Sequence, residues 1–402
     1  MNLSIKWVAP ILAALAMAAC NAGGSSSLPG STGQTTSPAQ RHSVMPEWKV
    51  KNLAREACPM VIGKPTCTAL IENKSRIGHT IAGWTPSTIE SIYDLPYQTN
   101  GSGQIVAIVD AYDNPNVASD LAEYRTEFGL GTANFTKYNQ DGQQGNYPSG
   151  SEGWGVEIDL DVQMVSAACP NCTIYLIEAN GADTSDLQTA EAEAVTLGAH
   201  VVSNSWICYG SFSCVDQSYF DVAGVTFLAA SGDYGYNETG APSALPTVVA
   251  VGGDTISQSG SQYTEAVWDG AGAGCATGVT KPTWQHDPDC TSRTIADVSA
   301  VAWDVAEYDT YGYGGWFEVG GTSVATPLNA ATFALRGNQA TRDAAREFWD
   351  RRQKQRLKDL NTISTGNDGS CGGEYLCQAG TGQFKTYSGP SGWGTPHGVG
   401  LY

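Results

Sequence analysis

Residues 320–327 (Gly-Gly-Thr-Ser-Val-Ala-Thr-Pro) could supply a nucleophile. The two glycines permit a tight turn and a close approach of the backbone to a ligand. An apolar run of small residues continues to Leu335 and predicts a buried helix that begins close to Ser323. Unpaired N–H groups and the helix dipole favour negative charge at such a start. Ser323 is therefore a candidate nucleophile if a base lies nearby, and the plainer interpretation is a helix N-cap.

A histidine is the usual base for such a serine. The chain has five, at His42, His79, His200, His286 and His397. None of them opens a helix after a glycine, and the last two fall in loop-like sequence. A histidine-dependent triad is therefore the less favoured arrangement.

A pair of carboxylates is the better candidate for the base. The sequence Gly-Val-Glu-Ile-Asp-Leu-Asp-Val opens a predicted helix, and its Glu157 and Asp161 share one helix face because they are four residues apart. If they are buried near a common site, they would hold a proton between them. If they are exposed, they are only a solvated helix face, which is the plainer interpretation of an isolated Glu-x-x-x-Asp.

Two further acids follow predicted strands. Asp233 lies in the sequence Ser-Gly-Asp-Tyr-Gly after an apolar run, where an aspartate is ordinarily a turn residue. A protonated aspartate can instead donate a hydrogen bond to an oxyanion. Asp110 ends another apolar run. In open α/β folds the chemistry gathers at these carboxyl ends of the strands.

Alternating elements must position these residues. Buried strands are predicted at 104–109, 173–177, 200–202, 225–229 and 247–251, and helices at 84–95, 118–128, 157–168 and 184–197. This alternation predicts an α/β fold with a mostly parallel central sheet flanked by helices on both faces. A last helix carries the basic run 351–358, interpreted as a solvated face, and the tail 359–402 is loop-like.

The chain of 402 residues carries a formal net charge of −19, which argues against a nucleic-acid partner. Lys6 and the apolar residues 8–18 predict a signal peptide that is too short to span a bilayer. Small residues before Cys20 resemble a lipobox, although ordinary signal peptidase could also cut there. We therefore expect a signal peptide at 1–20, a flexible tether and short leader at 21–82, and one domain at 83–402.

Cysteine spacing indicates disulfides. Ten of the 11 cysteines form close pairs, namely Cys58/Cys67, Cys169/Cys172, Cys208/Cys214, Cys275/Cys290 and Cys371/Cys377. Such pairing favours an oxidising compartment. Zinc is disfavoured, because a single pair has zinc spacing and it lacks a second half.

Five motifs in order resemble the sedolisins, the serine-carboxyl peptidases, which share the subtilisin-like fold and replace the triad histidine with glutamate. The motifs lie at 155–161, 203–206, 231–235, 296–300 and 320–327. The resemblance covers roughly 83–398. Each motif is weak alone, and their shared order and spacing make the resemblance specific.

The resemblance implies Ser323 as nucleophile, Glu157 as general base and then acid, Asp161 as the group that orients and shares a proton with Glu157, and Asp233 as oxyanion-hole donor. A model glutamate titrates near about 4.3 and a histidine near about 6.5. The family therefore implies an endopeptidase that acts on polypeptides at acidic pH.

The same resemblance implies roles for three further residues, on a less direct match. Asp110 matches an accessory acid of some members, and Ser205 and Trp206 fall where the family lines its substrate cleft.

The resemblance also implies a calcium site near the C-terminus. Asp359, Leu360, Gly380 and Gly382 match its first parts, but Ser388 stands where an aspartate is expected. Calcium prefers six or more oxygen ligands including carboxylates. The loss of one carboxylate leaves calcium binding open.

Two other functions remain open from the sequence. A catalytically inactive binding protein of the same fold, displayed at the cell surface, would explain the short leader and the altered tail. An esterase of the α/β-hydrolase type is disfavoured, because no Gly-x-Ser-x-Gly occurs. We expect an exported monomer with a polypeptide substrate. It is either secreted or held as a periplasmic or cell-surface lipoprotein, and a lipid on Cys20 is the one membrane attachment that we expect.

Overall fold

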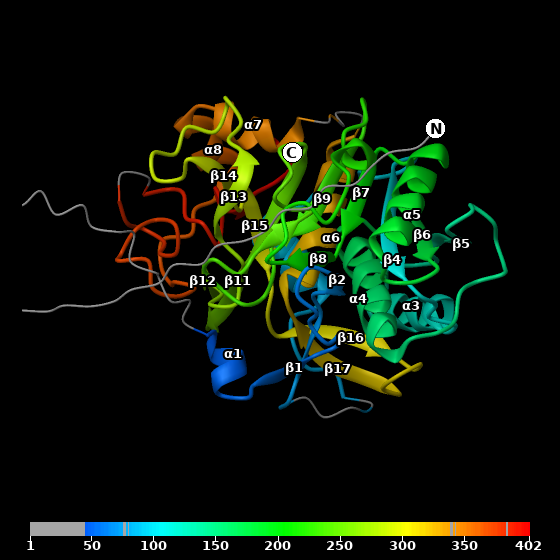
Figure 1. Ribbon diagram of the computed structural model, residues 1–402. Coiled ribbons are helices and arrows are strands. Elements are labelled where there is room, and N and C mark those ends of the chain that lie inside the picture. The colour runs from blue at the N-terminus through cyan, green and yellow to red at the C-terminus, as the bar shows by residue number, and fades with distance from the viewer. Residues whose placement is uncertain (1–44, 75–77, 79, 338–340, 342, 383–384) are drawn as a thin grey trace, which may run out of the picture. The chain divides into compact units, whose positions relative to one another are not determined.

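The computed structural model describes residues 45–74, 78, 80–337, 341, 343–382 and 385–402 (Figure 1). The predicted signal peptide, Cys20 and the tether to residue 40 lie outside the described residues. No helix in these ranges has the length and apolar character needed to span a membrane.

The helices are α1 Glu47–Val50, α2 Pro86–Tyr93, α3 Val117–Glu127, α4 Glu152–Ala168, α5 Thr184–Thr196, η1 Gln217–Phe220 (a 3-10 helix), α6 Thr322–Arg336, α7 Ala344–Asp350 and α8 Gln353–Asp359. The strands are β1 Ala54–Glu56, β2 Pro65–Cys67, β3 Leu70–Glu72, β4 Ile105–Ala111, β5 Asn134–Asn139, β6 Thr173–Ala179, β7 Val201–Asn204, β8 Trp206–Tyr209, β9 Thr226–Ala230, β10 Gly240–Ala241, β11 Val248–Ser259, β12 Gln262–Val267, β13 Gly274–Thr280, β14 Ser292–Ile295, β15 Val298–Val301, β16 Val305–Asp309, β17 Gly315–Gly320, β18 Leu360–Asn361 and β19 Thr395–Pro396.

The central sheet has the strand order β12-β11-β9-β7-β4-β6-β5, with β15 also paired to β11. All of its pairs are parallel except the β11–β12 hairpin. The apolar runs of the sequence form β4, β6, β7, β9 and the first part of β11. The prediction of an α/β fold with a mostly parallel sheet is therefore confirmed.

Helices cover both faces of this sheet. Alternate residues of β4 point to opposite faces, because side chains in a strand have a period of two. Val106 and Ile108 pack in the core that holds α4 and α6, whereas Ala107 and Val109 pack in the core that holds α5. The helix α4 is buried from Trp154 to its end, so its acids face protein on every side.

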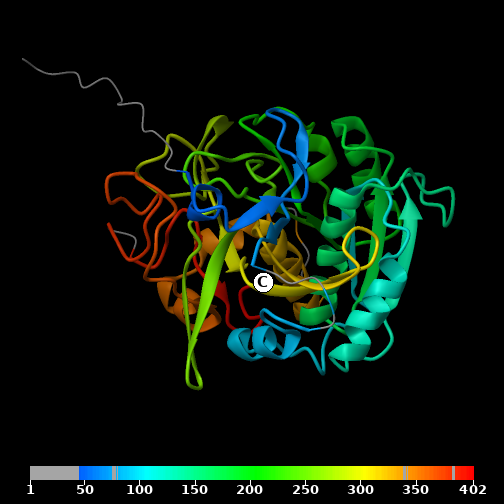
Figure 2. The same cartoon turned by 90° about the horizontal axis from the view of Figure 1, so that it is seen from below.

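Residues 45–72 pack into the body of the domain. Strand β3 pairs antiparallel with β17, and β2 pairs antiparallel with β8. Figure 2 shows this segment, in blue, lying against the rest of the domain. The described residues from 45 to 402 belong to one compact unit. The expected division at residue 83 is therefore not a division between compact units.

The basic run 351–358 begins in the break between α7 and α8 and continues into α8, rather than lying on one long helix. Arg356 donates to the carbonyl of Phe348 (3.1 Å), and its guanidinium lies 3.7 Å from the centre of the Trp393 ring. Such stacking is a favourable cation–π contact. The other basic residues of the run, Arg351, Arg352, Lys354 and Lys358, are exposed, as a solvated face requires, and Arg356 is the exception.

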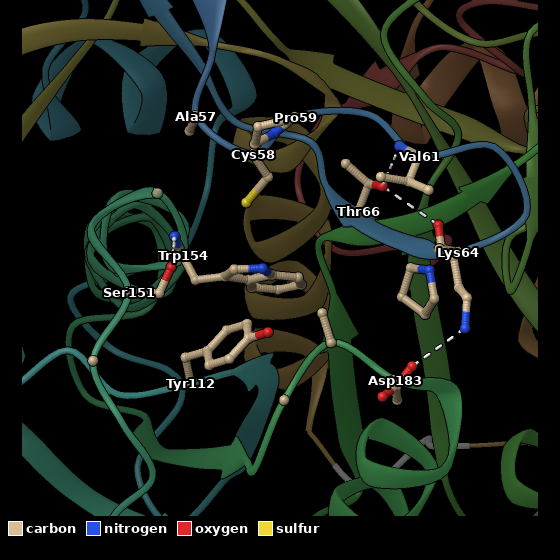
Figure 3. A pocket seen from close by; sticks show the side chains of 15 residues that line it. Ala57, Cys58, Pro59, Val61, Lys64, Thr66, Tyr112, Ser151, Trp154 and Asp183 are labelled. Carbon is tan, nitrogen blue, oxygen red and sulfur yellow. Dashed lines mark hydrogen bonds and ion pairs between the residues drawn. The ribbon is translucent and has the colours of Figure 1, made fainter.

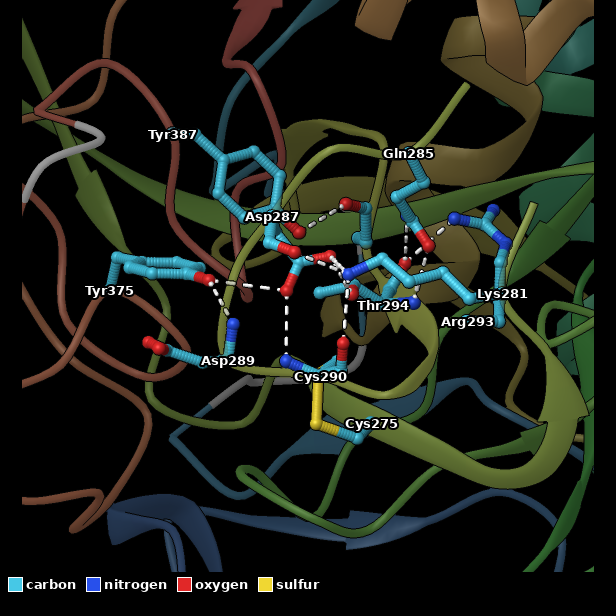
Figure 4. Close-up of a disulfide and its surroundings, with 11 residues drawn as sticks. Cys275, Lys281, Gln285, Asp287, Asp289, Cys290, Arg293, Thr294, Tyr375 and Tyr387 are labelled. Carbon is cyan, nitrogen blue, oxygen red and sulfur yellow. Dashed lines mark hydrogen bonds and ion pairs between the residues drawn. A yellow bond between two sulfur atoms is a disulfide. The ribbon is translucent and has the colours of Figure 1, made fainter. Parts of the chain in front are cut away.

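Five disulfides join the cysteine pairs that the spacing predicts. The loop closed by Cys275–Cys290 is anchored by the buried carboxylate of Asp287 (Figure 4). This carboxylate accepts hydrogen bonds from the amide of Cys290 (2.9 Å) and the hydroxyl of Tyr375 (3.1 Å), and it pairs with Lys281 (2.6 Å). Charged groups buried in this way are satisfied by partners, as they must be.

Asp297 and Arg293 form a wholly buried ion pair next to β11 of the central sheet. Asp297 also accepts hydrogen bonds from the amide of Ala250 (2.8 Å) and the indole of Trp349 (2.8 Å). We expect Asp297→Ala to lower the free energy of unfolding by about 3–5 kcal/mol, because it leaves a buried cation unpaired. Chemical denaturation followed by intrinsic fluorescence would measure the loss.

The matched control is the exposed pair of Arg346 with Asp350, which has the same residue types and spacing. Asp350→Ala should cost no more than about 1 kcal/mol, because exposed ion pairs contribute little. Equal losses for the two variants would contradict the structural role given to Asp297.

Candidate active site

The predicted nucleophile lies at the start of α6. Gly321 is the N-cap, with φ 111°, and Ser323 is the second residue of the helix. The interpretation of Ser323 as an N-cap is therefore wrong. A Cβ on Gly321 would lie 2.0 Å from the carbonyl oxygen of Thr68, so a side chain cannot be accommodated there. The glycine thus lets the backbone of another segment approach Ser323.

Ser323 is wholly buried and meets groups from three other segments. Its Oγ lies 2.6 Å from the Oγ1 of Thr68 and donates to the carbonyl of Ser205 at 3.5 Å. Its hydroxyl also lies close enough to Glu157 to lower the pKa of that carboxyl by hydrogen bonding. The structure therefore brings the predicted nucleophile and base together.

The carboxyls of Glu157 and Asp161 on α4 are wholly buried, so the interpretation of a solvated helix face is wrong. Burial raises the pKa of Glu157 most, and the neighbouring Asp110 raises it further. Burial, Asp110 and Glu157 likewise raise the pKa of Asp161, while a hydrogen bond from the hydroxyl of Ser205 (2.7 Å) opposes the rise. Glu157 Oε2 accepts from the amide of Ala69 at 2.7 Å.

Asp110 completes this group of acids. It lies in β4 near its carboxyl end, and within the described residues neither of its oxygens has a hydrogen-bond partner. Burial raises the pKa of Asp110 to about 8. Buried carboxyls that face one another cannot all ionise. The ionisation of Asp110, Glu157 and Asp161 is therefore interdependent.

Asp233 contacts Thr322, the residue before Ser323, from the loop after β9. Its Oδ1 accepts hydrogen bonds from the amide (2.8 Å) and the hydroxyl (2.9 Å) of Thr322. Burial raises the pKa of Asp233 to about 7, although the bonds from Thr322 oppose the rise. Its Oδ2 lies 3.0 Å from the position that a Cβ on Gly321 would take. A proton on Oδ2 would therefore face the space in front of Ser323.

The predicted cleft residues lie beside the segment that contains Thr68. The carbonyl of Ser205 accepts from the amide of Thr68 at 3.1 Å. Trp206 is wholly buried at the start of β8, opposite Cys67, and its ring packs against Phe220 at 6.3 Å. Ser205 thus contacts the residue that follows β2, and Trp206 pairs with the last residue of β2.

The histidines do not contribute to this group in the part of the chain that the structure describes. His200 contacts the carbonyl of Gly224 (3.3 Å), and the amide of His397 donates to Asp359 (3.1 Å). His42 and His79 lie outside the described residues.

Sequence reasoning missed the contacts made by the leader. Thr68 and Ala69 contact Ser323 and Glu157, and the indole of Trp48 donates to the carbonyl of Asp233 (2.8 Å). Residues 41–82 show little periodicity, so no local pattern announces these contacts. The cysteine pair at 58 and 67 is the one sign that this segment is ordered.

The residues expected to bind calcium do not fit such a site well. The Asp359 carboxylate is nearly buried and hydrogen-bonded to a neighbouring glutamine side chain. Gly380 lies against the carbonyl of Ser364, and Gly382 lies against the ring of Tyr375. One engaged carboxylate does not provide the oxygen-rich shell that calcium prefers. The calcium site stays a prediction, and we assign no step to it.

Comparison with known proteins agrees with this geometry. No protein-family model matches the chain. The chain is 28% identical to kumamolisin of Bacillus sp. (strain MN-32) over 62% of its own length and 51% of that protein, and 25% identical to sedolisin of Pseudomonas sp. (strain 101) over 80% and 61%. The chain thus spans about half to three fifths of the length of these relatives.

Solved structures show the same fold. A Pseudomonas sedolisin (serine-carboxyl proteinase) complexed with pseudo-iodotyrostatin superposes with a TM-score of 0.63 at 22% identity, over 79% of this chain and 96% of that one. The S41 psychrophilic protease gives 0.51 at 17% identity, over 80% and 99%. The chain therefore has the subtilisin-like fold of sedolisin and is similar in sequence to sedolisin and kumamolisin.

Proposed function

We propose that the protein is a serine-carboxyl endopeptidase that hydrolyses polypeptides at acidic pH. The observation that carries this proposal is the burial of Ser323 close to Glu157 and its buried neighbours Asp110 and Asp161, with Asp233 hydrogen-bonded to the preceding residue, Thr322. The relatives' peptidase names support the same reaction class. The presence of every group that the reaction needs favours an enzyme over a binding protein of the same fold.

The geometry suggests a role for each group. Ser323 attacks the substrate carbonyl while Glu157 takes its proton, and Asp161 steadies Glu157 by sharing a proton with it. Asp233 donates a hydrogen bond from Oδ2 to the oxyanion. Glu157 then returns the proton to the leaving amine, and a water molecule hydrolyses the acyl-enzyme with Glu157 again as base.

This scheme fixes the direction of the pH dependence. Asp233 must be protonated to donate, and burial keeps that proton on the group up to about pH 7. Activity should therefore be lost as the pH rises through about 7. Glu157 must have an accepting oxygen, and burial raises its pKa, so activity should also fall as the pH drops through the range in which Glu157 takes up a proton, and the profile is bell-shaped.

The test is hydrolysis of denatured casein by the purified protein between pH 3 and pH 9. We expect an acidic optimum and a loss of at least about 10⁴-fold for Ser323→Ala. Ser243→Ala removes another buried hydroxyl, which donates to the carbonyl of Gly240 (2.9 Å), and should retain activity. An optimum above neutral pH, or full activity in Ser323→Ala, would contradict the proposal.

We also propose that the protein is exported. Five disulfides in the described residues support an oxidising compartment. Lipid attachment at Cys20 and a monomeric state stay predictions.

A further inference from the structure

A cavity of about 380 Å³ lies between α1 and the segments that follow β12 and β18. Ligand sites typically combine apolar walls with a few polar groups that fix the orientation of the ligand. The lining of this cavity has that composition and includes Met45, Pro46, Val267, Trp268, Asp269 and Asp368. Its acids therefore indicate what the cavity binds.

Asp368 is a buried acid whose side chain has no partner. It is 1% exposed, and neither of its carboxyl oxygens has a hydrogen-bond partner among the other described residues. Its backbone is engaged, because its amide donates to the carbonyl of Cys377 (3.0 Å) and its carbonyl accepts from the amide of Tyr236 (3.0 Å). Burying a polar group without a partner is costly. A cation in the cavity would supply the partner.

Asp269 gives the cavity a second carboxyl. Burial raises the pKa of Asp368, and the neighbouring Asp269 raises it further. Gly235 lets these two segments come together, since a Cβ there would lie 2.6 Å from the carbonyl oxygen of Asp368 and 3.2 Å from that of Asp269. One cation between the two carboxyls would stabilise the charged form of both.

The cavity adjoins the candidate active site. Two consecutive residues of α1 contact both places, because the amide of Glu47 donates to Asp269 and the indole of Trp48 donates to the carbonyl of Asp233 (2.8 Å). The distance between the cavity and Asp233 can therefore be spanned by neighbouring residues of one polypeptide. A substrate that is bound at the active site would have side chains within reach of the cavity.

A larger cavity, of about 680 Å³, lies beside Trp154 and Tyr112 (Figure 3). The acid that lines it, Asp183, already pairs with Lys64 at 3.3 Å, and both side chains are exposed. Exposed pairs of this kind are solvated and need no further partner. The buried, unpaired acid thus favours the smaller cavity as the place for a cation.

We propose, resting on the function proposed above, that the smaller cavity binds a lysine or arginine side chain of the polypeptide substrate, with Asp368 and Asp269 as the residues that determine this specificity. The methylene groups of the basic side chain would lie along Val267 and Trp268, as long basic side chains commonly do on apolar surface. Its charged end would pair with the two carboxyls beside the Trp268 ring. The cation favours the ionised carboxyls, so they lose their protons as the substrate binds.

The test is digestion of a peptide library by the purified protein at about pH 5, with the cut sites identified by mass spectrometry. We expect lysine and arginine to be enriched at one fixed distance from the bond that is cut. Two peptides that differ only in lysine or norleucine at that position then measure the preference. The lysine peptide should have a kcat/KM about 10- to 100-fold higher, as expected for hydrogen bonds between charged groups.

Asp368→Asn and Asp269→Asn should each lower this ratio of kcat/KM values towards one. Glu191→Gln is the matched control, because it neutralises another wholly buried carboxyl, on α5 and outside the cavity, and should keep the ratio. Thermal unfolding checks that each variant is folded. Asp269 is only partly buried, so Asp269→Asn decides the result if Asp368→Asn does not fold.

The outcomes separate this inference from the proposed function. Casein hydrolysis with no enrichment of basic residues at any position would overturn the inference and leave the peptidase standing. An enrichment that survives in full in either folded variant would do the same. A folded wild-type chain that cuts neither casein nor the peptide library would overturn both.

Discussion

Glu157→Gln is expected to lower kcat/KM for a peptide substrate by about 10³–10⁴-fold, the usual contribution of a positioned general base and acid. The amide keeps the size of the side chain but can neither take the proton of Ser323 nor return one to the leaving amine. Rates should be expressed per folded chain.

Asp159→Asn is the matched control for this variant. Asp159 lies two residues further along α4 and is equally buried, but it faces Asn114 (2.6 Å) and Asp309 rather than Ser323. Burial raises its pKa as well, so an uncharged replacement suits its surroundings. We expect its kcat/KM to stay within about 10-fold of wild type. If both variants lose the same share of kcat/KM, the effect of Glu157→Gln comes from a disturbed α4 rather than from the loss of a general base.

The central sheet could be predicted from the sequence because its strands are continuous apolar runs. In β4, for example, residues 106–111 are all buried, and the run reports this burial directly. The outer strands carry no such signal. Strands β12 and β16 alternate or are partly polar, and their partners are set by hairpins and by packing. Tertiary context decides such strands more than local propensity does.

The site divides in the same way. The spacing of Glu157 and Asp161 on one helix, and the glycines before Ser323, are local patterns that the sequence displays. The approach of Thr68 to Ser323 joins positions 255 residues apart, and nothing in the residues near Thr68 records it. Contacts of that separation are made by sheet pairing, here of β2 with β8 and of β3 with β17, rather than by local sequence.

Asp233→Ala is expected to lower kcat/KM by about 10²–10³-fold, the usual effect of removing one oxyanion-hole donor. Asp233→Asn should behave differently, because an amide can accept from Thr322 at one end and donate to the oxyanion at the other. At about pH 4 we expect it to retain activity within about 10-fold of wild type. The comparison separates hydrogen-bond donation from a merely structural role of the side chain.

The pH profile of the same variant gives the sharper result. In wild type, activity should fall as the pH rises through about 7, where Asp233 loses the proton that burial keeps on it. An amide does not titrate, so the alkaline limit of Asp233→Asn should move to higher pH, up to the limit set by the Asp110, Glu157 and Asp161 group. Asp254→Asn, at a buried carboxyl hydrogen-bonded to Ser391 and outside this site, should leave that limit in place. An unchanged limit in Asp233→Asn would mean that its proton is not the one that donates to the oxyanion.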